Sequence, residues 1–96
     1  MPQVNKLTTT GTGQAADFIR VGPGDHVLEF RWAGSAGDAD LQNKSVDSST
    51  FADTYDSAGV VNITANKSVR VSGNQDYSVD VTTHTSALTV TAHSCE

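Results

Sequence analysis

The sequence predicts an all-β fold, an antiparallel two-sheet β-sandwich or jelly roll of about seven or eight short strands. Apolar and polar residues alternate with a period of two over several stretches, which is the pattern of strands with one buried and one solvated face. Val and Thr contribute 11 and 12 of the 96 residues, and both favour pleated strands over helices. Clusters of turn residues separate these stretches every 8–12 residues or so, and helical periodicity is not sustained anywhere.

In the first half of the chain, three strands are expected, over 17–21, 26–32 and 39–46. The alternation is clearest in the second, where one face carries His26, Leu28, Phe30 and Trp32. A single Trp that continues an inward alternation is typical of a core residue, so Trp32 is expected in the core rather than on a ligand-binding surface. The stretch 51–55 is ambiguous between strand and loop.

The second half of the chain predicts four strands, over 60–64, 68–72, 77–82 and 88–93. Short connections that contain Asn66, Gly73-Asn74 and Thr83–Ser86 join them, and Asn66 is able to take a positive φ. We therefore expect a four-strand meander, in which each strand pairs with the next one along the chain.

Composition and charge exclude several classes of function. The formal net charge is −5, with 6 Lys and Arg against 11 Asp and Glu, and nucleic-acid and anionic-membrane partners are therefore not expected. No apolar stretch approaches the roughly 18 residues of a membrane span, and the N-terminus lacks the apolar region of a signal peptide. Leu, Ile, Val and Phe make up only 20 of 96 residues. A core this thin favours assembly with other chains.

The first 14 residues differ from the rest of the chain, which is expected to form a single sandwich domain over 15–96. They are polar and rich in Thr and Gly, and they form either an edge strand or an arm that becomes ordered on a neighbour. Within this segment Val4, Leu7 and Gln14 are the candidate partner-binding residues. We expect that deletion of residues 1–14 leaves a folded domain that no longer binds its partner.

Residue types with catalytic or metal-binding chemistry do not form a recognisable motif. With three histidines and nine aspartates, the sequence contains the residue types of a Ser-His-Asp catalytic triad, but local signatures such as G-x-S-x-G are absent. Asp38 and Asp40 lie on one side of a strand, as Ca²⁺ ligands can, yet calcium-loop spacing is missing. The single cysteine, Cys95, excludes an intrachain disulfide. No enzyme activity, metal or cofactor is expected.

The order of features resembles a group of small virion proteins of tailed bacteriophages. The resemblance rests on the G-x-G-Q-x-A-D-F-I segment from Gly11 to Ile19, the strand entry from Gly22 to Trp32 and the run from Ala36 to Gln42. It continues in Val46-Asp47-Ser48-Ser49 and in the stretches 60–71, 76–81 and 88–91. Proteins of this kind are one-domain β-sandwiches that decorate or cement the capsid lattice, or that contribute to tails and fibres.

The resemblance implies a structural role in the virion after synthesis in the bacterial cytoplasm. Its partners would be the major capsid protein or another virion protein, together with further copies of the chain, and trimers around a symmetry axis are one common arrangement. The alternative is a tail or fibre component, or a carbohydrate-binding β-sandwich module. An exposed aromatic patch would distinguish that alternative from a capsid protein.

Overall fold

The computed structural model describes residue 4 and residues 6–94, and in this part of the chain the fold is all-β, as predicted. Seven strands have three or more residues: β1 (Lys6–Thr9), β3 (Ile19–Val21), β4 (Asp25–Trp32), β5 (Asp38–Ser45), β10 (Lys67–Ser72), β11 (Gln75–Thr83) and β12 (Leu88–Ser94). Five have two residues: β2 (Gly13–Gln14), β6 (Ala52–Asp53), β7 (Tyr55–Asp56), β8 (Gly59–Val60) and β9 (Asn62–Ile63). None of the described residues belongs to a helix long and apolar enough to cross a membrane.

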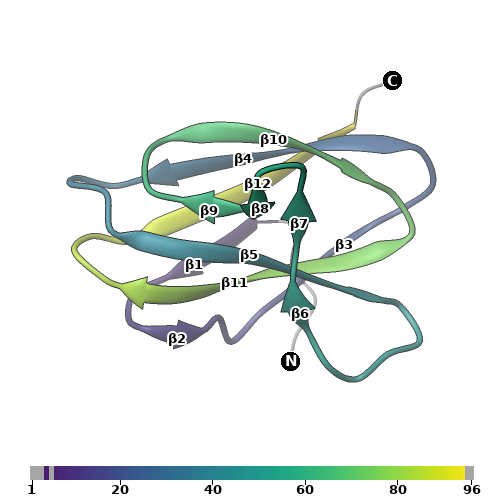
Figure 1. The fold of residues 1–96 in the computed structure, drawn as a ribbon, viewed down its shortest axis with the longest axis horizontal. Coiled ribbons are helices and arrows are strands. Elements are labelled where there is room, and N and C mark those ends of the chain that lie inside the picture. Colours follow the sequence, from purple (N-terminus) through teal and green to yellow (C-terminus); the bar gives the residue numbers. More distant parts are fainter. Residues whose placement is uncertain (1–3, 5, 95–96) are drawn as a thin grey trace.

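The strands form two antiparallel sheets and a small hairpin (Figure 1). One sheet has four strands in the order β1-β12-β4-β10. The other has six, with β11 and β5 at its centre. Two short strands lie along each of its edges, β2 and β3 beside β11 and β6 and β9 beside β5. The hairpin pairs β7 with β8.

The core lies between the inner faces of the two sheets. The four-stranded sheet contributes Leu28, Phe30 and Trp32 from β4 and Leu88 and Val90 from β12, all of them at most 5% exposed. The six-stranded sheet contributes a matching set, which includes Ala39, Leu41, Ile63, Val79 and Val81. The period-two alternation therefore marks the buried faces correctly, and Trp32 is a core residue as expected.

The meander expected over 60–93 is wrong. After β9 in the six-stranded sheet, the chain crosses to β10 in the four-stranded sheet, returns to β11 and crosses again to β12. The strands pair with β4 and β5 from the first half of the chain instead of with each other. A sandwich core needs apolar faces from both layers. Alternate strands of one continuous segment supply them here.

The turns that make these crossings differ from hairpin turns. Asn74 takes a positive φ of 60°, and its backbone N–H donates to the carbonyl oxygens of Val21 and Gly22, each at 3.0 Å. Asn66 is not among the described residues with a positive φ. Its side-chain Oδ1 instead accepts a hydrogen bond from the backbone N–H of Trp32 at 2.7 Å. Both asparagines therefore tie a connection of the second half to the first half of the chain.

Candidate interaction surfaces

The N-terminal segment closes one side of the sandwich. β1 pairs with β12 at the edge of the four-stranded sheet, and β2 pairs with β11 in the six-stranded sheet. The backbone N–H of Val4 donates to the carbonyl of Phe18 at 2.8 Å. In the described part of this segment, residue 4 and residues 6–14, β1 is an edge strand, and β1 and β2 contact both layers. Residues 1–3 and 5 lie outside the described residues.

The three candidate partner-binding residues lie in different environments. Leu7 is 1% exposed and belongs to the core, and Val4 is partly buried against the same core. A contact between Leu7 and a partner would require β1 to leave its sheet. Gln14 is exposed, and its Nε2 donates to Oε1 of Gln42 at 3.0 Å. The expectation that a chain without residues 1–14 stays folded disagrees with the burial of Leu7, because the deletion removes a core side chain and a strand.

The outer face of the six-stranded sheet carries a concentration of carboxylates, and we call it the acidic face. Its carboxylates are Asp38, Asp40, Asp53 and Asp80, and the amides of Gln14, Gln42 and Asn62 lie among them. One row crosses four strands in register, and it consists of Gln14, Asp80, Asp40 and Asn62. The Asn62 Nδ2 donates to Asp40 Oδ1 at 2.9 Å and also to Asp38 Oδ1. The Asp38 and Asp40 carboxylates are therefore held at fixed positions on the sheet.

Asp40 and Asp80 are direct cross-strand neighbours within this row. Like charges at directly opposed positions of adjacent strands destabilise a sheet. The Asp40 carboxylate has Asn62 as a donor, whereas the Asp80 carboxylate has no hydrogen bond or ion pair with any described residue. The repulsion lowers the free energy of unfolding, and a neutral residue at either position would remove it. The requirement to fold therefore does not explain why both positions carry a carboxylate.

A buried ion cluster occupies one end of the acidic face. The side chain of Asp76 is 0% exposed and receives two hydrogen bonds from Arg20, at 2.7 and 3.1 Å, and one from Lys44 at 2.7 Å. The Lys44 Nζ also lies 5.5 and 5.4 Å from the ring centroids of Phe18 and Phe51. Burial alone would raise the pKa of Asp76, but the two cations outweigh it and the pKa is lowered.

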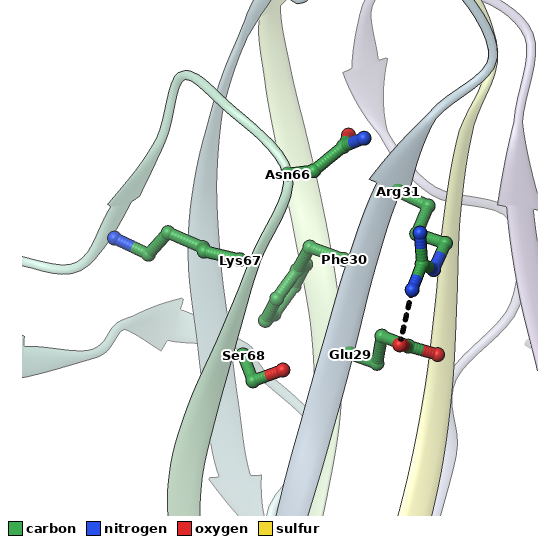
Figure 2. A pocket seen from close by; sticks show the side chains of 6 residues that line it. All are labelled: Glu29, Phe30, Arg31, Asn66, Lys67 and Ser68. Atoms are coloured by element: carbon green, nitrogen blue, oxygen red, sulfur yellow. Dashed lines mark hydrogen bonds and ion pairs between the residues drawn. The ribbon is translucent and has the colours of Figure 1, made fainter.

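The outer face of the four-stranded sheet has a different charge pattern. It carries the cations Lys6, Arg31 and Arg70 and the carboxylates Asp25 and Glu29, and His93 adds a charge when protonated. Figure 2 shows Arg31 folded back onto Glu29 from the same strand. The two side chains form an ion pair at 2.9 Å, and both residues line a hollow of about 160 Å³. Hydrogen bonding to Arg31 lowers the pKa of Glu29. Cations and carboxylates nearly balance here, in contrast to the four carboxylates of the acidic face.

The side of the sandwich opposite the N-terminal segment is open. There, a groove of about 610 Å³ runs between the edge strand β10 and the segment Asp53–Asp56. Asn43, Gln75 and Tyr77 also line it, from the six-stranded sheet. The Asn43 Nδ2 donates to Gln75 Oε1 at 2.6 Å, and the Tyr77 hydroxyl donates to the Ser72 carbonyl at 2.9 Å. This groove was not expected from the sequence.

The histidines lie in three different places. His26 is half-buried at the start of β4 with its Nδ1 3.2 Å from the Gly24 carbonyl, and His84 belongs to the β11–β12 connection. His93 lies on the outer face of the four-stranded sheet, 3.6 Å from Glu29. Within the described part of the chain, no three His, Cys, Asp or Glu side chains are grouped so that they could hold a metal ion.

No protein family model, curated protein or solved structure matches this chain.

Proposed function

We propose that this chain is a structural component of a bacteriophage particle, which decorates or cements the capsid through protein–protein contacts without catalysis. The resemblance of its sequence to small virion proteins supports the location. The observation that carries the proposed contact is the acidic face, where Asp40 and Asp80 oppose each other across adjacent strands. The docked surface of the partner would be cationic.

The energetics of the Asp40–Asp80 pair support this assignment. In the free protein the two carboxylates repel each other, at a cost of up to about 1 kcal/mol. A lysine or arginine of a partner at this position would replace the repulsion by two favourable contacts. The amides of Gln14 and Gln42 lie beside the pair and offer donors and acceptors to partner backbone. Gln14 is thus the one sequence-predicted contact residue that this surface includes.

The test measures occupancy on particles of the phage that encodes the chain. Particles that lack the protein are mixed with purified wild type, the double variant Asp40→Asn/Asp80→Asn or the control Asp25→Asn. The control removes one carboxylate from the opposite outer face. We expect the double variant to bind at least about tenfold more weakly, the control to bind like the wild type, and wild-type binding to weaken with salt.

Two outcomes would contradict the proposal. One is a double variant that occupies particles as well as the wild type, and the other is the absence of the protein from purified particles. Density at the tail instead of the capsid lattice in an image reconstruction would favour the tail or fibre alternative. The same reconstruction would give the copy number and the oligomeric state.

A further inference from the structure

The groove on the open side of the sandwich has an apolar floor and a polar rim. Val61, Val71 and Tyr77 form much of the floor, and each is at most 7% exposed. The rim carries the carboxylates of Asp53 and Asp56. Its volume of about 610 Å³ lies within the range of about 300–1,000 Å³ that is usual for small-molecule sites.

An exposed aromatic ring lies at the rim. Tyr55 lines the groove and is 70% exposed, and its hydroxyl has no hydrogen-bond partner among the described residues. Its direct cross-strand neighbour on β8 is Val60, which is also exposed, at 36%. Only one other large apolar residue in the described part of the chain, Val46, is exposed. The exposed apolar surface is therefore concentrated on the β7–β8 hairpin, beside the groove.

The rim carboxylates retain acceptor capacity. Asp56 Oδ1 accepts the backbone N–H of Ala58 at 2.8 Å, and Asp53 Oδ1 is 3.4 Å from the Gln42 amide. Neither Oδ2 atom has a hydrogen bond or ion pair with a described residue. Each carboxylate can thus accept a further hydrogen bond from a hydroxyl that enters the groove.

We infer that this groove binds a neutral saccharide. A sugar ring presents an apolar C–H face and a rim of hydroxyl groups, and it would stack on Tyr55 while its hydroxyls donate to Asp53 and Asp56. The two carboxylates disfavour anionic sugars by repulsion, and Arg70, the cation that lines the groove, already pairs with Asp25 at 3.1 Å. Asp53 belongs to both surfaces, but the groove contains neither Asp40 nor Asp80, so this inference does not rest on the acidic-face contact proposed above.

An added peptide strand is the other occupant that an open sheet edge suggests. Strand addition requires an edge that accepts a new backbone, and charged side chains on an edge strand oppose it. β10 carries Lys67 and Arg70 among its six residues, and both are exposed. The exposed aromatic ring and the unpaired carboxylate oxygens fit a polyhydroxylated ligand better than a hydrophobic strand.

The test is a titration of ¹⁵N-labelled protein, followed by amide chemical shifts. The probes are maltotriose, cellotriose, chitotriose and mannotriose as neutral saccharides and sialyllactose as the anionic one, each up to millimolar concentration. We expect at least one neutral probe, and not sialyllactose, to shift amides of Asp53–Asp56 and β10. Tyr55→Ala should weaken that binding at least about tenfold, and Tyr55→Phe should retain most of it because the ring remains.

The matched control is Val46→Ala, which trims the exposed apolar side chain that does not line the groove. It should bind like the wild type. The inference is overturned if no neutral probe shifts the groove amides, if sialyllactose binds as well as the neutral probes, or if Tyr55→Ala binds unchanged while its spectrum shows a folded protein.

Discussion

The Asp76 carboxylate is fully buried, yet it is held ionised by two cations on the outer side of a sheet. Lys44 is itself only 10% exposed in its side chain, with two aromatic rings nearby. A buried charge is costly unless it is paired and hydrogen-bonded. Each member of the cluster therefore depends on the others, and Asp76 is the member that both cations share.

We expect Asp76→Asn to lower the free energy of unfolding by about 3 kcal/mol at neutral pH, because it leaves Lys44 buried without its counter-charge. The folded-state pKa of Asp76 lies below the ordinary value of 3.8. Its contribution is therefore present above that pH and is lost as the pH falls through the folded-state pKa. Urea unfolding at neutral pH and near pH 3 should show a difference between wild type and variant that shrinks in acid.

Asp80→Asn is the matched control for that substitution, since Asp80 opposes a carboxylate instead of a cation. We expect it to raise the free energy of unfolding by about 0.5 kcal/mol. If Asp80→Asn destabilised the protein as much as Asp76→Asn does, the Asp40–Asp80 pair would not be repulsive in the free protein.

Leu7 tests whether the N-terminal segment belongs to the folded domain. Leu7→Ala should lower the free energy of unfolding by about 3 kcal/mol, as expected for a buried leucine, while Thr8→Ala at the next, exposed position should change it little. Chemical denaturation of both variants measures this. Equal, small effects would mean that the segment is a detachable arm.

At the scale of elements, two of the connections between layers approach neighbouring backbone very closely at a glycine. Gly73 lies in the β10–β11 connection, and a Cβ atom built there would overlap the carbonyl oxygens of Gly22 and Gly24. Gly37, before β5, would place its Cβ against the Thr83 carbonyl in the same way. Gly73 thus lets its connection lie directly on the β3–β4 connection, and Gly37 lets the β4–β5 connection lie on the end of β11.

Gly73→Ala should therefore lower the free energy of unfolding by more than about 2 kcal/mol, because backbone atoms would have to move. Gly22→Ala provides the control, since a Cβ atom there meets nothing within 4 Å. Thermal unfolding of the two variants compares them. If both melted at the same temperature, the close approach of the two connections would be disproved.

The sequence predicts strands better than it predicts their partners. The alternation in 26–32 and 77–82 depends only on which face is buried, so it locates β4 and β11 to within two residues at either end. The same alternation is compatible with a hairpin or with a crossing between layers. The short connections favoured a meander, and the strands instead cross between layers. The two-residue strands β6 to β9 have too few residues to show any period.

The candidate surfaces depend on strand register, which the sequence does not contain. Asp38 and Asp40 stand out in the sequence as a pair, but the position of Asp80 opposite Asp40 follows only from the pairing of β5 with β11. Arg20, Lys44 and Asp76 come from three strands that are distant in the chain. The groove also combines residues of both sheets, so no local pattern indicates it.

At the scale of the whole molecule, one side of the sandwich is closed by the N-terminal segment and the other is open along the groove. The central strands β4, β12, β5 and β11 are paired on both edges. The hairpin β7–β8 pairs only with itself. Resistance to local opening should differ accordingly, because it follows the number of packed and paired neighbours.

Hydrogen exchange should show the slowest amide exchange in the four central strands and the fastest exchange of any strand in β7 and β8. The measurement is native-state exchange followed residue by residue. Protection of β7–β8 equal to that of β4 would contradict this view of the open side, and it would mean that the hairpin is anchored more firmly than its pairing indicates.

The strand order also has a consequence for how the chain becomes folded during translation. β12 follows every other described strand in the chain, yet it lies between β1 and β4. While the ribosome is still adding residues before 88, β1 has no strand to join, and β4 lacks its neighbour on that side. The four-stranded sheet therefore cannot be completed until residues 88–94 have been synthesised, whereas every strand of the six-stranded sheet has been made by then.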